Sequence, residues 1–258
     1  MQDYNKREIL VLGDSLLVVP EMFFEFTKIL QEKIEESKPN FEILVSANMK
    51  GGLNLHNISK LVHHKFTERL KQKKPYPDIV IYHANSDYFI TDNPFPYERR
   101  FAKFLKYLKR RVRAVIILSP GLFSPLGECS EHWNDSDQFN SIKVGRIQSK
   151  ACKESKTLFI DFRKILQDKI AEISKQTGYP GKDLSNMIGK KKDWEVQDKE
   201  LQKKLGKDEK NLMTTWDYQG NGGMLTFDGE HLNRRGTKLL VSTLENTILD
   251  LKILWKNS

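Results

Sequence analysis

Five short apolar runs recur along the chain, and segments with helical amphipathic spacing separate them. Each run is continuously apolar rather than alternating, which is typical of parallel strands that are covered on both faces. The runs predict strands at 8–13, 41–47, 78–84, 113–120 and 157–162. The amphipathic segments predict helices at about 21–37, 54–73, 96–111 and 137–155, with a last helix at about 234–252.

This alternation predicts right-handed crossovers and a three-layer α/β/α architecture, a doubly wound sheet of about five parallel strands as in flavodoxin-like folds. Such a sheet presents its active site beyond the carboxyl ends of the strands. We expect a single domain over residues 1–258, because no linker or internal repeat interrupts the pattern. A lysine-rich stretch at about 168–224 contains no convincing strand, and we interpret it as an insertion that is either a lid or a surface excursion.

Composition narrows the class of protein. A chain of 258 residues with 38% hydrophobic residues can bury the core of one large α/β domain. No apolar run approaches the roughly 18 residues of a membrane span, and the first residues are polar. Cys129 and Cys152 lack metal-ligand spacing and make no disulfide framework, although they could pair. We therefore expect a cytoplasmic protein, with a secreted protein that has lost its leader as the alternative.

Much of the formal charge of +9 is concentrated in one segment, Arg99–Arg113, which holds eight basic residues and no acidic one. Its apolar positions follow helical spacing, so the cations are expected on the opposite face. That face is either simply solvated or attracts an anionic partner, such as a phosphorylated substrate, a membrane surface or nucleic acid. Nucleic acid has the least support, because the sequence shows no zinc-finger spacing and no RNP-type aromatic signature.

Two short segments contain candidate catalytic residues. The first predicted strand runs through ILVLGDSLL into Gly13, Asp14 and Ser15. Ser15 either helps to cap the following helix or lies where α/β proteins expose a nucleophile. In FDGEHLNRRG, Asp228 and His231 are three residues apart, a spacing that can bring a carboxylate to an imidazole. Taken alone, that pair is more commonly a capping Asp followed by a surface His.

Together, four segments resemble the sequence blocks of the SGNH hydrolases, the GDSL esterase and lipase family, in order and placement along nearly the whole chain. They are GDSLL after the first strand, KGGLN after the second, HANSD after the third and DGEHLN before the last helix. The first and last are the more specific matches.

The resemblance implies a role for each matching residue. Ser15 corresponds to the nucleophile, His231 to its general base and Asp228 to the carboxylate that orients the base. The oxyanion hole would consist of the Ser15 N–H, the Gly52 N–H and the Asn85 side chain, with Gly51 as the alternative glycine donor.

The third block departs from the family pattern Gly-x-Asn-Asp, because His83 stands at the glycine and Ser86 at the aspartate. His83 either narrows the substrate pocket or points into the sheet as a hydrogen-bonded core histidine, and we favour the core position.

The function that the resemblance implies is hydrolysis of carboxylic esters through a Ser-His-Asp triad and an acyl-enzyme, with a short-acyl or carbohydrate O-acetyl ester favoured. No cofactor or metal is implied. The substrate would be a small-molecule, glycan or lipid ester, and a lysophospholipase or thioesterase is also compatible. A second hypothesis is a weakly active or inactive binding protein on the same scaffold, which recognises an anionic partner.

Overall fold

The first strand, β1 (Lys6–Gly13), pairs in parallel with a strand on each side. The computed structural model describes residues 5–83, 87, 95–120, 135–178, 187–188, 221–222, 225 and 231–255. Its main sheet has the order β2-β1-β3-β4-β5, and all of its pairings are parallel. The other strands are β2 (Glu42–Met49), β3 (Ile79–Tyr82), β4 (Ala114–Leu118) and β5 (Leu158–Ile160). The predicted five-stranded parallel sheet is therefore confirmed.

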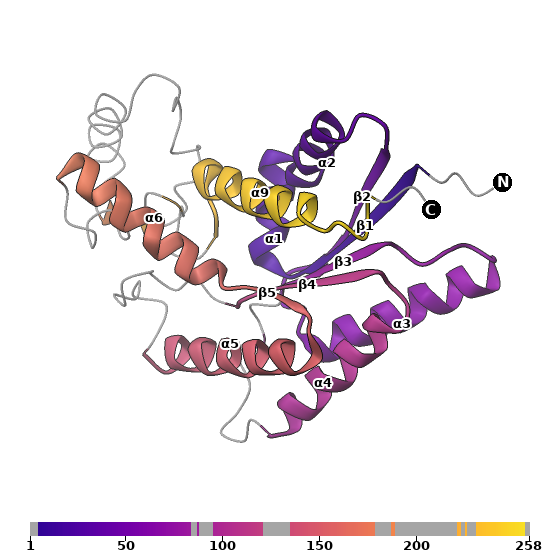
Figure 1. Ribbon diagram of the computed structural model, residues 1–258. Helices are drawn as coiled ribbons and strands as arrows, with labels where there is room; N and C mark the ends of the chain where they lie inside the picture. The colour runs from indigo at the N-terminus through magenta and orange to yellow at the C-terminus, as the bar shows by residue number, and fades with distance from the viewer. Residues whose placement is uncertain are drawn as a thin grey trace.

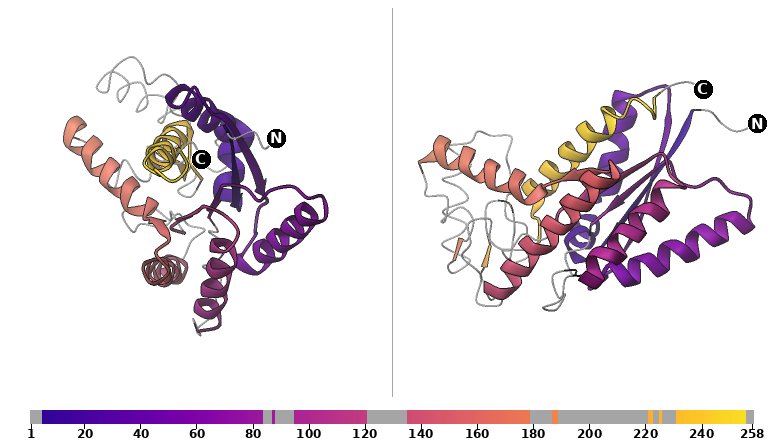
Figure 2. Two further views of the ribbon diagram at one scale, coloured as in Figure 1. Left: turned by 45° about the vertical axis from the view of Figure 1, so that its right-hand side comes forward. Right: turned by 60° about the horizontal axis from the view of Figure 1, so that its bottom comes forward.

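Helices cover both faces of the sheet (Figures 1 and 2). Side chains alternate along a strand, so Ile9 and Val11 of β1 belong to one core cluster and Leu10 and Leu12 to another. The first cluster includes side chains of α1 (Ser15–Phe24), α2 (Phe26–Ser37), α6 (Phe162–Thr177) and α9 (Arg234–Leu249). The second includes side chains of α3 (Leu55–Lys71), α4 (Phe95–Lys109) and α5 (Asp135–Ser155). The helices of the two clusters therefore form one layer on each face of the sheet, which gives the three-layer architecture.

The first helical region differs from the prediction, because two helices stand where one was expected at about 21–37. Glu25 interrupts them with φ 47° and ψ 47°, in the left-handed region. Within α1, Pro20 contributes no backbone N–H donor. The carboxylate of Glu21 accepts hydrogen bonds from Thr27 N (2.9 Å) and Thr27 Oγ1 (2.6 Å), which stabilises the start of α2.

Helix α6 was missing from the predicted helices, because its lysines obscured its apolar face. It begins after Asp161, whose side chain accepts a hydrogen bond from Lys164 N at 3.1 Å. Leu166, Ile170 and Ile173 are buried in the first core cluster. Residues 168–177, assigned from sequence to the insertion, thus belong to a helix packed on the sheet. Further along, β6 (Met187–Ile188) and β7 (Asn221–Gly222) form an antiparallel pair, and the rest of the insertion lies outside the described residues.

The basic segment around α4 has the predicted amphipathic arrangement. Its apolar side chains are buried against the sheet, and seven of its eight cations are exposed, Arg111 being half-buried. The Arg111 guanidinium lies 3.8 Å from the centre of the Tyr107 ring. Among the described residues, no helix has the length and apolar composition that crossing a bilayer requires.

Gly236, in the first turn of α9, is predicted to be intolerant of any side chain. A Cβ there would overlap the carbonyl oxygen of Leu225 and lie 3.0 Å from Leu232 Cδ2. That carbonyl accepts the Asn233 N–H at 3.0 Å, so it cannot withdraw without losing this bond. We expect Gly236→Ala to lower the free energy of unfolding by about 1–3 kcal/mol in urea denaturation.

Gly145→Ala is the matched control, because its Cβ would meet Pro120 Cδ at 3.7 Å, an ordinary contact inside α5. Replacing a glycine within a helix should leave stability unchanged or raise it by up to about 1 kcal/mol. Equal effects of the two substitutions would contradict the close approach at Gly236.

Candidate active site

Ser15 lies at the carboxyl end of β1, as the first residue of α1. Gly13 permits this abrupt change of direction, because a Cβ there would lie 2.6 Å from Leu17 Cδ1. The Asp14 carbonyl accepts the N–H groups of Leu17 (3.1 Å) and Val18 (3.0 Å) and so starts the helix. The Ser15 N–H belongs to the first turn, whose donors have no acceptor within the helix. It is therefore suited to bind an anionic oxygen.

Gly52 occupies a tight turn between β2 and α3. Leu53 N donates to Lys50 O at 3.3 Å, and Gly52 has φ +73°, the value that the third position of a type II turn requires. Lys50 N donates to Gly13 O at 3.2 Å, which joins this turn to the end of β1. The turn explains why a glycine is needed at position 52. The role of Gly52 as an oxyanion donor, with Gly51 as the alternative, stays a prediction.

His231 is half-buried and lies three residues before the start of α9. The next residue, Leu232, is fully buried in the first core cluster, and Asn233 caps α9 by accepting hydrogen bonds from Arg235 N (2.9 Å) and Gly236 N (3.0 Å). Leu232 and Asn233 thus anchor the segment that contains His231 to the core and to the start of α9.

The two ends of α9 show where His231 lies relative to the sheet. Arg7 Nε donates to Leu254 O at 2.7 Å, which places the residues after α9 at the amino end of β1. The 16 residues of α9 span about 24 Å, and the eight residues of β1 span about 26 Å. The start of α9 therefore reaches the carboxyl end of the sheet, on the face that α1 also covers (Figure 1).

Ser15 and His231 thus share one end and one face of the sheet. The strand order reverses at β1, because the chain passes from β1 to β2 on one side and then to β3 on the other. Such a reversal is the usual ligand-binding position in doubly wound sheets. Asn85, Ser86 and Asp228 lie outside the described residues, so the triad and the oxyanion hole stay predictions.

His83 is a core residue, as favoured from the sequence. Its side chain is 1% exposed, and its backbone N–H donates to Leu12 O at 2.9 Å. The ring Nδ1 lies 3.4 Å from Oδ1 of the fully buried Asp14. This is an ion-pair distance for a protonated ring, but its geometry does not form a hydrogen bond. The bulky side chain at the family's glycine position therefore contacts the residue that precedes Ser15.

Asp87 is the main residue that the sequence analysis missed. It is fully buried, and its Oδ1 accepts the Leu55 N–H at the start of α3 at 2.7 Å. Its Oδ2 accepts the hydroxyls of Tyr82 (2.6 Å) and Tyr97 (2.9 Å), and Gln148 Nε2 donates to the Tyr97 oxygen at 2.7 Å. The carboxylate at the end of the third block therefore connects β3, α3 and α4 directly, and α5 through Tyr97. The only sequence signal was an aspartate one position later than the family pattern.

Burial dominates the electrostatics of this cluster. Desolvation raises the pKa of Asp87 to about 6, although the hydrogen bonds from Tyr82, Leu55 and Tyr97 oppose the change. Desolvation, followed by the negative charge of Asp87, raises the pKa of both tyrosines, so their hydroxyls remain protonated donors.

Other nucleophile and metal chemistry has little support among the described residues. Cys152 is a buried free thiol, and desolvation raises its pKa to about 12, so it stays protonated at neutral pH. Cys129 lies outside the described residues. In the part of the chain that the structure describes, no group of three His, Cys, Asp or Glu side chains could hold a metal ion.

Solved structures share this fold. The acetyl xylan esterase AlAXEase matches with a TM-score of 0.59 at 14% identity, over 93% of this chain and 99% of its own. A lipase/acylhydrolase from Enterococcus faecalis matches with a TM-score of 0.52 at 14% identity, over 94% of this chain and 95% of its own. Neither protein-family models nor curated protein sequences give a match. The likeness confirms, at the level of the fold, the resemblance to SGNH hydrolases.

The pKa of Asp87 predicts a particular dependence of stability on pH. Between about pH 4 and about pH 6 the native Asp87 retains a proton that the unfolded chain has released, so the contribution of Asp87 to the free energy of unfolding falls as pH rises and then levels off. A pKa raised from 3.8 to about 6 corresponds to about 3 kcal/mol. Asp87→Asn, which cannot titrate, should flatten this part of the profile in urea denaturation at a series of pH values.

Asp168→Asn removes an exposed carboxylate on α6 and serves as the control. Its profile should parallel that of the wild-type chain. An Asp87→Asn profile that parallels the wild-type profile across this window would show that the pKa of Asp87 is not raised.

Proposed function

We propose that the chain is a serine hydrolase of carboxylic esters. The observation that supports this most strongly is the position of Ser15 in the first turn of α1, at the strand-order reversal, with His231 at the same end and face of the sheet. A hydroxyl and an imidazole in that arrangement need only approach within hydrogen-bond distance to form a nucleophile and its base.

In the proposed reaction, Ser15 Oγ attacks the ester carbonyl and its proton passes to His231. The tetrahedral intermediate collapses with cleavage of the bond to the alcohol oxygen, and the alcohol leaves with the proton from His231. Water, deprotonated by His231, then attacks the acyl-enzyme, and the acid and free Ser15 are released. Asp228 would hold the His231 ring in the correct tautomer. This chemistry requires no cofactor.

The developing oxyanion would be stabilised by the N–H groups of Ser15 and Gly52 and by the Asn85 side chain. Loss of one such donor typically raises the barrier by about 2.7–4 kcal/mol. The hydrogen bond from Lys50 N to Gly13 O supports this proposal, because it keeps the turn of Gly52 beside the segment that contains Ser15. Asp87 supports it as well, because its carboxylate holds the start of α3, three residues after Gly52.

A short-acyl or carbohydrate O-acetyl ester is the favoured substrate. The solved structure with the higher TM-score of the two described is an acetyl xylan esterase, a likeness of fold that supports acetyl-ester chemistry by analogy. Longer-chain lysophospholipid or thioester substrates are the alternatives. A cytoplasmic location and a single domain over 1–258 also stay predictions.

The decisive variant is Ser15→Ala. The wild-type chain should hydrolyse a chromogenic acetyl ester faster than longer-acyl homologues and should be labelled by a fluorophosphonate probe at Ser15, as read by mass spectrometry. Ser15→Ala should reduce both signals to background, because the nucleophile is missing, with a loss of at least about 1000-fold in kcat. Ser242→Ala removes an exposed serine on α9 and should change neither. Equal, background-level signals from wild type and Ser15→Ala would reject the proposal.

A second candidate function, recognition of an anionic partner, rests on the exposed cations of α4. Lys103 and Lys106 are both exposed, on the side opposite the buried Phe104 and Leu108. If this face binds polyanions, affinity should fall steeply with salt. The retained Ser15 and His231 argue against a protein that only binds.

The test of this face is retention on heparin at low salt. The double substitution of Lys103 and Lys106 by Gln should lower the salt concentration of elution more than the same substitution of Lys28 and Lys60, exposed lysines of α2 and α3. Absence of retention of the wild-type chain, or an equal change in both double variants, would show that this face is only solvated.

A further inference from the structure

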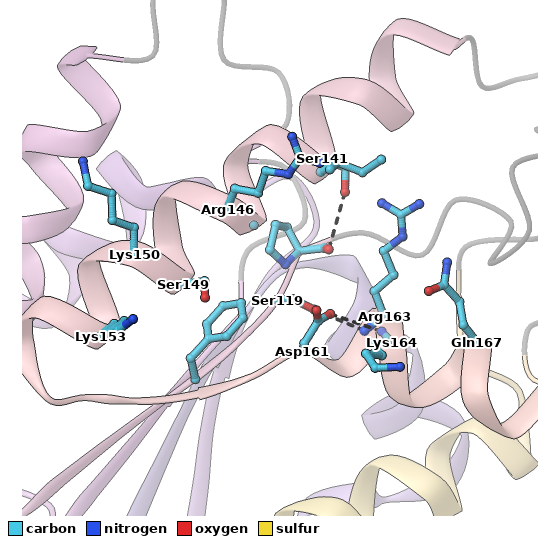
Figure 3. A pocket seen from close by; sticks show the side chains of 14 residues that line it. Ser119, Ser141, Arg146, Ser149, Lys150, Lys153, Asp161, Arg163, Lys164 and Gln167 are labelled. Carbon is cyan, nitrogen blue, oxygen red and sulfur yellow. Dashed lines mark hydrogen bonds between the residues drawn. The ribbon is translucent and has the colours of Figure 1, made fainter.

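A cavity of about 580 Å³ lies at the carboxyl ends of β4 and β5, between α5 and α6 (Figure 3). Ser119 and Pro120, which follow β4, and Asp161, which follows β5, contribute to its wall. Ser15 follows β1 at the same end of the sheet, and β4 is two strands away from β1. Since adjacent strands are about 4.8 Å apart, the cavity begins about 10 Å along this edge from Ser15.

The lining is strongly cationic. Asp161 is its one carboxylate among the described residues, against five basic side chains, namely Arg146, Lys150, Lys153, Arg163 and Lys164. Two of these cations are neutralised by carboxylates outside the lining, at 3.0 Å for Lys150 with Glu98 and 2.9 Å for Lys164 with Asp168.

The other three cations have no ion-pair partner within the described ranges. These are Arg146 and Lys153 of α5 and Arg163 of α6. Counting only the residues that the structure describes, the cavity has an excess of positive charge, which favours an anionic ligand.

Arg163 distinguishes this cavity from an ordinary basic surface. Its side chain extends from the start of α6 toward α5 and is half-buried (Figure 3). Desolvation lowers the pKa of its guanidinium, and Asp161 only partly opposes this effect. A partly desolvated guanidinium without an ion pair is unfavourable, and a bound oxyanion would compensate it with charge-assisted hydrogen bonds.

The backbone N–H groups at the start of α6 already donate hydrogen bonds within the protein. Arg163 N donates to Ser119 Oγ at 3.2 Å, and Lys164 N donates to the Asp161 side chain at 3.1 Å. A ligand would therefore be recognised by side chains, above all by the fork of donors on Arg163.

We propose that this cavity binds a carboxylate, sulfate or phosphate group of the ester that Ser15 cleaves. The proposal rests on the proposed function and specifies its substrate class, an ester whose anionic group lies about two strand spacings from the reacting carbonyl. Binding energy from this remote group would orient the ester at Ser15.

The test with substrates compares two matched esters, 4-acetoxybenzenesulfonate and the neutral 4-acetoxybenzenesulfonamide. We expect Arg163→Gln to lower the ratio of kcat/KM for the anionic over the neutral ester about tenfold, because only the anionic ester has a group that the guanidinium would bind. Arg163→Lys should retain part of the preference. Lys175→Gln, an exposed lysine near the end of the same helix, should retain all of it.

Direct binding separates this proposal from the proposed function. Inorganic sulfate should bind the Ser15→Ala chain, measured by calorimetry, and Arg163→Gln in that background should weaken its Kd at least tenfold, whether or not the wild-type chain hydrolyses esters. Arg146→Gln, at an exposed position on α5, is the second variant in case Arg163→Gln alters folding, and should also weaken sulfate binding.

Sulfate affinities that are equal in the parent and in both variants, or no binding at millimolar sulfate, would overturn the proposal. Arg163-dependent sulfate binding without any change in ester preference would also overturn it, because the cavity would then bind a free anion rather than part of the substrate.

Discussion

The parallel pairing of β1 with β2 on one side and β3 on the other is the constraint on which the rest of the molecule depends. Because the chain moves outward from β1 to β2 and then returns to β3, the segments after these three strands meet at one point. Ser15, Gly52 and His83 follow the three strands in that order. Helix α9 packs on the face of the sheet that α1 also covers, and its start brings His231 to the carboxyl end of β1. Residues separated by more than 200 positions therefore share one region because of strand order.

Buried polar groups hold these segments against the sheet. Asp87 is removed from water entirely, and such a carboxylate is tolerable only because three donors reach its two oxygens. Its bond to Leu55 N fixes the start of α3 against the end of β3. The pair of Asp14 and His83 lies close by, also buried. The departures from the family pattern in the third block are thus partly accommodated in the core: an imidazole fills the space beside Asp14, and the aspartate lies one residue later.

The positive charge of the chain is distributed over surfaces with different physical properties. In the segment Arg99–Arg113, which includes most of α4, the cations are largely exposed to water, and two of them have local partners: Lys109 donates to Ser155 O, and Arg113 lies 3.1 Å from Asp78. Exposed charges of this kind contribute little to stability and act mainly through a long-range field. Arg163 is partly desolvated in a cavity at the carboxyl ends of β4 and β5. Desolvation strengthens the interaction of a cation with an anion. We therefore expect the few cations of the cavity to bind an anion more specifically than the exposed cations of Arg99–Arg113.

The sequence by itself determined the five strands of the main sheet and most of the helices, because a strand covered on both faces needs a continuous apolar run and a covering helix needs an apolar stripe. It did not indicate the short pair β6 and β7. The observed β1 and β2 match their predicted ranges within two residues at each end. The sequence also predicted that Ser15 follows the end of a strand, because a glycine followed by polar residues ends the apolar run. Helix α6 was not predicted, because the lysines between Leu166 and Ile170 and around them obscure the amphipathic spacing.

Only the tertiary structure decided the strand order, the burial of Asp87, and the meeting of α5 and α6 around Arg163. Each of these depends on contacts between distant segments, and no local pattern of residues specifies which segments become neighbours.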